Sequence, residues 1–173
     1  MRARKVKGID PAGTVADNAQ RIIAVRLDEL TAFVPTVLDP DEVEALHDMR
    51  IAAKRLRYIL DVTGDLFGPY AHDARKRVKR LQALLGEIHD CDELEPRVLA
   101  VLEELRAADV RAVVEGGEPA HGEDLRGLEL LLVRTRARRN MLFTDFCAFW
   151  TRLERDGFAA RLSYAISERP VAA

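Results

Sequence analysis

Apolar residues recur at helical spacing along almost the whole of this chain of 173 residues. Val15, Ala19, Ile22 and Leu30, for example, fall on one side of a helix drawn at about 100° per residue. Strand signals are almost absent, because no alternating apolar run is present and no Asn-Gly or Asp-Gly turn joins two β-branched stretches. The sequence therefore predicts an all-α fold.

Turn-forming residues divide this pattern into a helical bundle of about five to seven helices. Asp39 followed by Pro40 is typical of a helix start. A tight connection is expected over residues 89–96, with Pro96 in the first turn of the next helix. Residues 115–124 are rich in Gly and acid and predict a flexible loop. The expected helices cover residues 14–34, 39–63, 68–89, 92–108, 125–155 and 158–169.

A chain of this length is expected to fold as one domain. Residues 1–13 are basic but lack the apolar core of a signal peptide, so a flexible basic arm is expected before a single domain over residues 14–169. No apolar run approaches the roughly 18 residues of a membrane span. A cytoplasmic protein without a membrane partner is expected.

Positive charge is concentrated in a small part of a chain whose net charge is −2. Residues 50–80 carry nine Lys or Arg against three Asp, which gives +6 and leaves −8 for all other residues. The basic residues of the expected second and third helices fall on stripes away from the apolar ones. The stripes are formed by His47, Arg50, Lys54 and Arg57, and by His72, Arg75, Lys76 and Lys79.

Basic neighbours three or four residues apart repel one another in both stripes, at about 0.2–0.5 kcal/mol per pair. The sum of roughly 1–3 kcal/mol is a noticeable part of a marginal stability. The stripes therefore indicate an anionic partner, and the mixture of Arg and Lys suits phosphate. Two neighbouring rows of cations fit a linear polyanion better than a single phosphate ester. Specific nucleic-acid binding is not expected, because the acidic remainder of the chain would repel DNA and no helix-turn-helix pattern is present.

The segment LHDMRIAAKRLRYIL, followed by VKRLQALLGEIHDCDEL, resembles the CHAD domain, the conserved histidine α-helical domain. In that family a His-x-x-Arg-x-x-x-(Arg/Lys)-Arg-Leu-Arg helix precedes a basic helix that ends in Leu-Gly and an Asp-containing turn. The later RTRARRNMLFTDFCAFWTRLERDGF is similar to the family's flanking helices. The resemblance implies an all-helical, CHAD-like domain whose basic helices line a groove or pore that binds inorganic polyphosphate.

Carried over residue by residue, the resemblance places the polyphosphate ligands on the two basic helices. Arg55 points about 80° away from His47 around the helix, and His72 is added from the stripe of the third helix. The expected function is non-catalytic polyphosphate binding in the cytoplasm, with association to polyphosphate granules. The ligands implied by the resemblance are His47, Arg50, Lys54, Arg55, Arg57, Arg75, Lys76, Lys79 and Arg80.

The chain carries one clear copy of a motif that is present twice in the family's longer domains. In one alternative, RTRARR over residues 134–139 is a degenerate second copy, and Arg138 and Arg139 reach the basic groove. In the other alternative, two chains pair as a homodimer through an apolar contact, because the apolar residues of this segment spread too widely for one bundle face. The contact is expected to use Leu131, Phe143, Phe146, Phe149 and Trp150.

Two other functions compete with polyphosphate binding. Three His-Asp pairs favour a metal-dependent phosphohydrolase, although the crowded cations would repel a divalent metal. The other alternative is an interaction module that docks an acidic protein on its basic face. No nucleophile with an adjacent base is visible, so no catalytic residue, metal or cofactor is expected. The pairs are His47-Asp48, His72-Asp73 and His89-Asp90.

Overall fold

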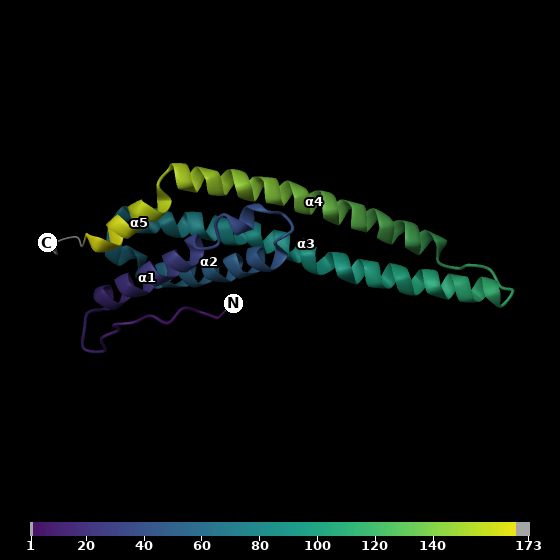
Figure 1. The fold of residues 1–173 in the computed structure, drawn as a ribbon, viewed down its shortest axis with the longest axis horizontal. Coiled ribbons are helices and arrows are strands. Elements are labelled where there is room, and N and C mark those ends of the chain that lie inside the picture. The colour runs from purple at the N-terminus through teal and green to yellow at the C-terminus, as the bar shows by residue number, and fades with distance from the viewer. Residues whose placement is uncertain (1, 169–173) are drawn as a thin grey trace. The chain divides into compact units, whose positions relative to one another are not determined.

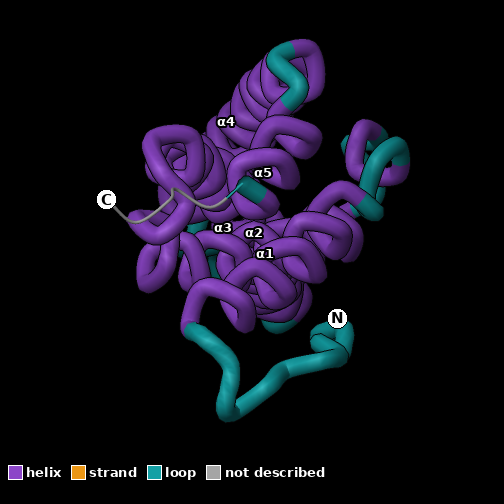
Figure 2. Tube along the Cα trace, turned by 90° about the vertical axis from the view of Figure 1, so that its left-hand side faces the viewer, coloured by secondary structure: helices purple, strands orange, loops and turns teal. Residues whose placement is uncertain are grey.

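The computed structural model describes residues 2–168, and their regular elements are all helical (Figure 1; Figure 2). The all-α prediction is confirmed. Within these residues no helix combines the length and the apolar character that crossing a membrane requires. The predicted end of the domain at residue 169 lies outside the described residues. The elements are α1 (Val15–Thr31), η1 (Thr36–Leu38), α2 (Val43–Thr63), η2 (Gly64–Phe67), α3 (Gly68–Val114), α4 (Gly122–Arg155) and α5 (Phe158–Ser167).

The expected connection over residues 89–96 is absent, because α3 continues through it as one helix. Pro96 lies within α3 at an exposed position, where its missing N–H removes one backbone hydrogen bond. Cys91, Val98 and Leu102 are buried along one flank of this stretch, so helix packing outweighs the proline. The predicted division into five to seven helices is corrected here, since the expected third and fourth helices are one.

The start of α2 also differs from its prediction. Asp39 does not cap the helix, because its carboxylate accepts the backbone N–H of Asp41 at 2.9 Å and closes a turn instead. The helix begins at Val43, and its N-cap residue Glu42 makes no side-chain capping bond. The expected end is confirmed, since α2 stops at Thr63 with Gly64 as its C-cap.

Two glycines mark the entry to α3 and the connection between α4 and α5. Gly68 has a φ of 76° at the start of α3, and Gly157 has a φ of 65° between α4 and α5. Both values lie in the left-handed region that favours glycine. The break predicted over residues 155–157 is therefore confirmed.

The chain divides into two compact units. The first comprises residues up to 86 together with residues from 145 onward, and the second comprises residues 87–144. In the first unit α1 packs along α2 (Figure 1). Its core includes Ile23, Leu27, Leu30, Leu46, Met49, Leu56, Leu60, Val78, Leu81, Leu85, Phe146, Trp150, Leu162 and Ile166.

A carboxylate is buried in the core of the first unit. Glu29 of α1 is only 1% exposed. Arg26 Nη1 donates to its Oε2 at 2.8 Å, and the backbone N–H of Arg4 donates to its Oε1. Arg26 also donates to the carbonyl of Arg4 at 3.1 Å. These contacts satisfy the buried charge and attach the basic N-terminal segment to α1 at Arg4.

The second unit is a hairpin made of the later part of α3 and the earlier part of α4, which run side by side (Figure 1). The connecting loop appears where the sequence predicts it. Asp109 Oδ1 accepts the N–H groups of Ala120 at 3.0 Å and His121 at 3.3 Å, and lies 2.7 Å from His121 Nδ1. The hairpin has a small core of Val98, Leu102 and Leu132, against which Leu99, Leu125 and Leu128 are partly buried.

We expect the loop between α3 and α4 to loosen in acid. The hydrogen bond with His121 lowers the pKa of Asp109 below its ordinary value of 3.8. The resulting stabilisation is complete above the ordinary pKa and disappears as the pH falls through the lowered folded value. The amide signals of Ala120 and His121, followed by NMR, should report this step. In an Asp109→Asn variant the step should vanish, and an equal response in both proteins would contradict the assignment.

Candidate anion-binding surface

The basic stripe of α2 is adjacent to the helix's apolar stripe. Leu46, Met49, Ala53, Leu56 and Leu60 are at most 2% exposed and face the core. Because side chains three or four residues apart share a face, burial of these positions fixes the direction of the neighbouring stripe. His47, Arg50, Lys54 and Arg57 therefore reach the surface together, where Lys54 is exposed and the other three are half-buried.

The first part of α3 repeats this arrangement. Ala71, Ala74, Val78, Leu81 and Leu85 are buried, and the cations lie on the other side of the helix. Lys76 and Lys79 are exposed, while His72 and Arg75 are half-buried. The surface formed by His47, Arg50, Lys54, Arg57, His72, Arg75, Lys76 and Lys79 is called the basic face below.

Two contacts join the α2 and α3 stripes. Arg75 Nε of α3 lies 3.5 Å from Asp61 Oδ1 of α2. Arg50 of α2 lies over Gly86 of α3, where a Cβ atom would stand 3.7 Å from Arg50 Nε. Between the first contact and the second, the residue number falls by eleven along α2, from 61 to 50. It rises by eleven along α3, from 75 to 86. The two helices are therefore antiparallel neighbours.

Acidic side chains neutralise part of the basic face. Asp61 contacts two arginines, because its Oδ2 lies 3.8 Å from Arg57 Nε while its Oδ1 faces Arg75. Lys76 pairs with Asp73 at 3.8 Å. His72 Nδ1 lies 3.8 Å from Asp65.

Three other cations of the face have no acidic partner among the described residues. Among the residues that the structure describes, no carboxylate oxygen lies within 4.0 Å of the side-chain nitrogens of Arg50, Lys54 or Lys79. Arg50 and Lys54 come from α2, and Lys79 comes from α3. Within the basic face, these three groups are therefore the arginine and lysine charges that no described carboxylate neutralises.

Two predicted ligands point elsewhere. Arg55 lies on the opposite flank of α2, where its Nη1 is 4.0 Å from Glu29 Oε1 of α1. Arg80 of α3 stacks its guanidinium on the ring of Phe149 in α4, 4.8 Å from the ring centre. Neither residue therefore lies where the α2 and α3 stripes of the basic face meet.

Tyr58 is a member of the surface that the sequence did not single out. The Arg57 guanidinium lies 4.8 Å and Lys54 Nζ lies 5.7 Å from the centre of its ring. The ring is 49% exposed, and it attracts both cations electrostatically. The sequence spacing could have predicted these contacts, because Tyr58 follows Arg57 directly and lies one helical turn after Lys54.

Arg138 and Arg139 lie in the second unit and are paired with acids there. Arg138 Nη2 donates to Glu87 at 2.7 Å, and Arg139 Nε donates to Asp92 at 2.6 Å. The hydrogen bond to Glu87 raises the pKa of Arg138. The Arg139–Asp92 pair is nearly buried, with side chains 13% and 11% exposed. Asp92 thus serves as the partner of an arginine.

Three of the four aromatic residues expected at a dimer contact are core residues instead, whereas Phe143 is half-buried. Phe146, Phe149 and Trp150 are at most 8% exposed in the first unit. They are therefore not available to a second chain, and the predicted contact is wrong for these three positions. Leu131 remains 39% exposed.

The His-Asp pairs do not gather into a metal site. Adjacent residues of a helix point about 100° apart, so each aspartate diverges from its histidine. Within residues 2–168 no group of three or more His, Cys, Asp or Glu side chains is placed to hold a metal ion.

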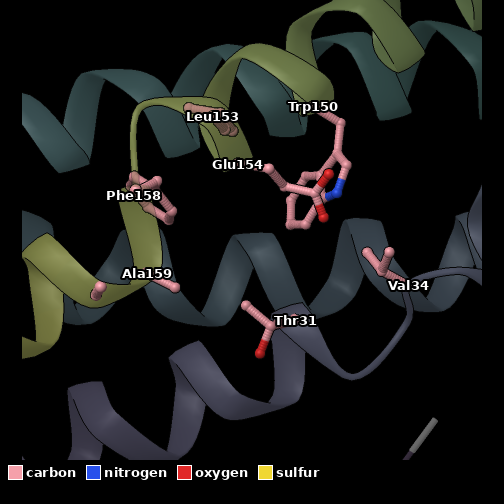
Figure 3. A pocket seen from close by; sticks show the side chains of 9 residues that line it. Thr31, Val34, Trp150, Leu153, Glu154, Phe158 and Ala159 are labelled. Atoms are coloured by element: carbon pink, nitrogen blue, oxygen red, sulfur yellow. The ribbon is translucent and has the colours of Figure 1, made fainter.

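A hollow in the first unit lies away from the basic face. It has a volume of about 300 Å³ and is lined by residues of α1, α4 and α5, including Trp150, Leu153 and Phe158 (Figure 3). Among the described residues that line it, Glu154 is the one that carries a charge. A carboxylate repels phosphate, so this hollow does not suit a polyanion.

The buried arginine pair should matter for stability more than the exposed one. In an Arg139→Leu variant, Asp92 loses the arginine that neutralises it in a nearly buried place, and a loss of about 3–5 kcal/mol is expected. The matched Arg138→Leu variant should change little, because its pair with Glu87 is 65% and 46% exposed. Urea unfolding followed by circular dichroism measures both. Equal losses in the two variants would contradict the distinction.

Comparison with known protein families supports the resemblance to the CHAD domain that the residues of α2 and α3 indicate. No curated protein and no solved structure gives a significant match to the chain. The family model of the CHAD domain matches residues 3–99, which is more than half of the chain and includes α1, α2 and the basic part of α3. The protein therefore belongs to the CHAD domain family.

Proposed function

We propose that this protein binds inorganic polyphosphate along the basic face without catalysing a reaction. CHAD domains as a class are linked with polyphosphate binding. One observation carries the proposal for this chain. Arg50, Lys54 and Lys79 lie on two adjoining helices and have no carboxylate partner within residues 2–168.

A linear polyanion suits this arrangement of charge. Arg50 and Arg57 are two helical turns apart, roughly 10 Å at 1.5 Å per residue, and α3 carries a second, antiparallel row beside them. Guanidinium groups bind phosphate oxygens in pairs, whereas the lysine ammonium groups act as mobile point charges. Several weak contacts to one chain add up, because each bound phosphate holds the next one close.

The face supplies charge rather than catalytic groups. Asp61 and Asp73 form ion pairs with cations of the face, and Asp65 lies 3.8 Å from His72 Nδ1. Cations of this kind stabilise bound phosphate but do not activate water. Such binding would also recruit the protein to polyphosphate granules in the cytoplasm.

Removing one of the cations without a carboxylate partner should weaken binding measurably. In Lys79→Gln and Lys54→Gln variants, we expect polyphosphate affinity to fall by about tenfold, which corresponds to about 1.4 kcal/mol. The slope of log affinity against log salt should also flatten by about one unit for each cation removed. Isothermal titration calorimetry at two salt concentrations, with polyphosphate of several lengths, measures both quantities.

The matched control is Arg111→Gln, which removes an exposed cation of the second unit. It should leave both the affinity and the salt slope unchanged. ATP and duplex DNA serve as competing anions, and orthophosphate release is assayed in the same samples. Affinity that falls equally in the control, or metal-dependent orthophosphate release, would contradict non-catalytic binding at this face.

Asp61 should limit the affinity of the face. Its carboxylate occupies Arg57 and Arg75, so a phosphate must displace it to reach either arginine. An Asp61→Asn variant keeps the size of the side chain and removes the charge, and we expect its polyphosphate affinity to rise several-fold. Asp73→Asn is the comparison, since Asp73 contacts only the exposed Lys76 in this face. A fall in affinity in Asp61→Asn would show that the acid supports binding instead.

A further inference from the structure

The second unit exposes an apolar stripe on both of its helices. Leu94 and Val101 of α3 are 38% and 42% exposed, and Leu131 of α4 is 39% exposed. Leu94 and Leu131 line the same cleft of about 350 Å³, and Val101 lies two turns beyond Leu94 on the same side of α3. The hairpin therefore has one face, called the hairpin face below, to which both helices contribute apolar groups.

Two helices alone cannot bury such a face. The apolar cluster between the two helices contains three buried residues, with three more partly buried against it, and the unit buries only a few apolar residues besides, among them Ile88 and Cys91. Helices that are apolar on more than one side are covered in bundles of three or four helices. The hairpin face is what a third and a fourth helix would cover.

The charges beside the hairpin face are separated by helix. Glu87 and Asp90 lie on α3, whereas Arg134 and Arg138 lie on α4, and all four line the cleft. Glu87 and Arg138 are paired with each other at 2.7 Å. Among the described residues, neither Asp90 nor Arg134 has an oppositely charged group within 4.0 Å. Asp90 and Arg134 can therefore pair with a partner that places an arginine opposite Asp90 and an acid opposite Arg134.

A second copy of this chain has that arrangement when the two-fold axis runs parallel to the helices. This rotation places α3 of one copy over α4 of the other and keeps each residue at the same level along the bundle. Asp90 of each copy then meets Arg134 of the other, and the apolar stripes meet between them. A two-fold axis across the helices would instead place α3 over α3 and reverse the level of each residue, so Asp90 would not lie opposite Arg134.

The size of the face is sufficient for a stable contact. The part of α3 in the second unit runs from 87 to 114, roughly 40 Å at 1.5 Å per residue. Two helices side by side are roughly 20 Å wide. The product, roughly 800 Å² per partner, is the size typical of specific protein–protein interfaces.

We propose that the second unit dimerises through the hairpin face, forming an antiparallel four-helix bundle in which Asp90 of each chain pairs with Arg134 of the other. This contact uses residues 87–144 alone and is independent of the polyphosphate proposal.

Sedimentation equilibrium over a wide range of protein concentration tests the dimer. Wild-type protein should be dimeric, and Leu94→Glu and Leu131→Glu should each raise the dissociation constant by about tenfold or more, because each places a charge in the apolar contact. The matched control is Val62→Glu, which adds the same charge at an 82% exposed position of α2 and should leave the dissociation constant unchanged. A wild-type monomer, or a dimer insensitive to both leucine substitutions, would overturn the proposal.

A mixing experiment tests the two-fold arrangement. Arg134→Glu opposes Asp90 of the partner with a glutamate, and Asp90→Arg opposes Arg134 with an arginine, so each variant alone should be largely monomeric. In an equimolar mixture, a heterodimer has one native and one reversed pair, both attractive, and should form at wild-type affinity. This recovery cannot arise within one chain, and it shows at the same time that both variants are folded. Failure of the mixture to associate would rule out the Asp90–Arg134 contact.

Discussion

Burial of the apolar stripes of α2 and α3 is the constraint on which the rest of the first unit depends. Leu56 and Leu81 are completely buried, and their helices have no freedom to rotate without exposing such groups. Because the basic residues are at fixed angles from the apolar ones, packing alone brings the two basic stripes to the surface as neighbours. The repulsion between them is thus a consequence of core formation, and hydrophobic burial is the larger free energy that maintains it.

Charge has a different role in the two units. In the first unit cations outnumber nearby acids, and Arg50 and Lys79 have no acidic partner among the described residues. In the second unit charges form cross-helix pairs, including Arg136 with Glu95 and Arg106 with Glu129. Arginine side chains therefore contribute to a partly neutralised surface in the first unit and join the two helices in the second. The difference lies in the acidic residues of the facing helix.

The sequence predicted the helical class and the two basic stripes because both follow from local periodicity. It did not predict the continuity of α3 through Pro96, since the burial of Val98 and Leu102 against α4 is a tertiary effect that local propensity does not contain. The sequence also did not predict the ion-pair partners of Arg55 and Arg139. They depend on Glu29 and Asp92, which are 26 and 47 positions away along the chain, and no helical wheel relates residues on different helices.

The carboxylate of Asp61 gives the basic face a counterion that never diffuses away. Because it is attached to α2, it is present at a high effective concentration beside Arg57 and Arg75. A free monovalent anion must compete with it alone, and loses translational freedom in doing so. A polymer already anchored at Arg50 and Lys54 presents its next phosphate at a comparable effective concentration. Under the proposed function, the tethered acid would act as a length filter, which discriminates against short anions more strongly than against long ones.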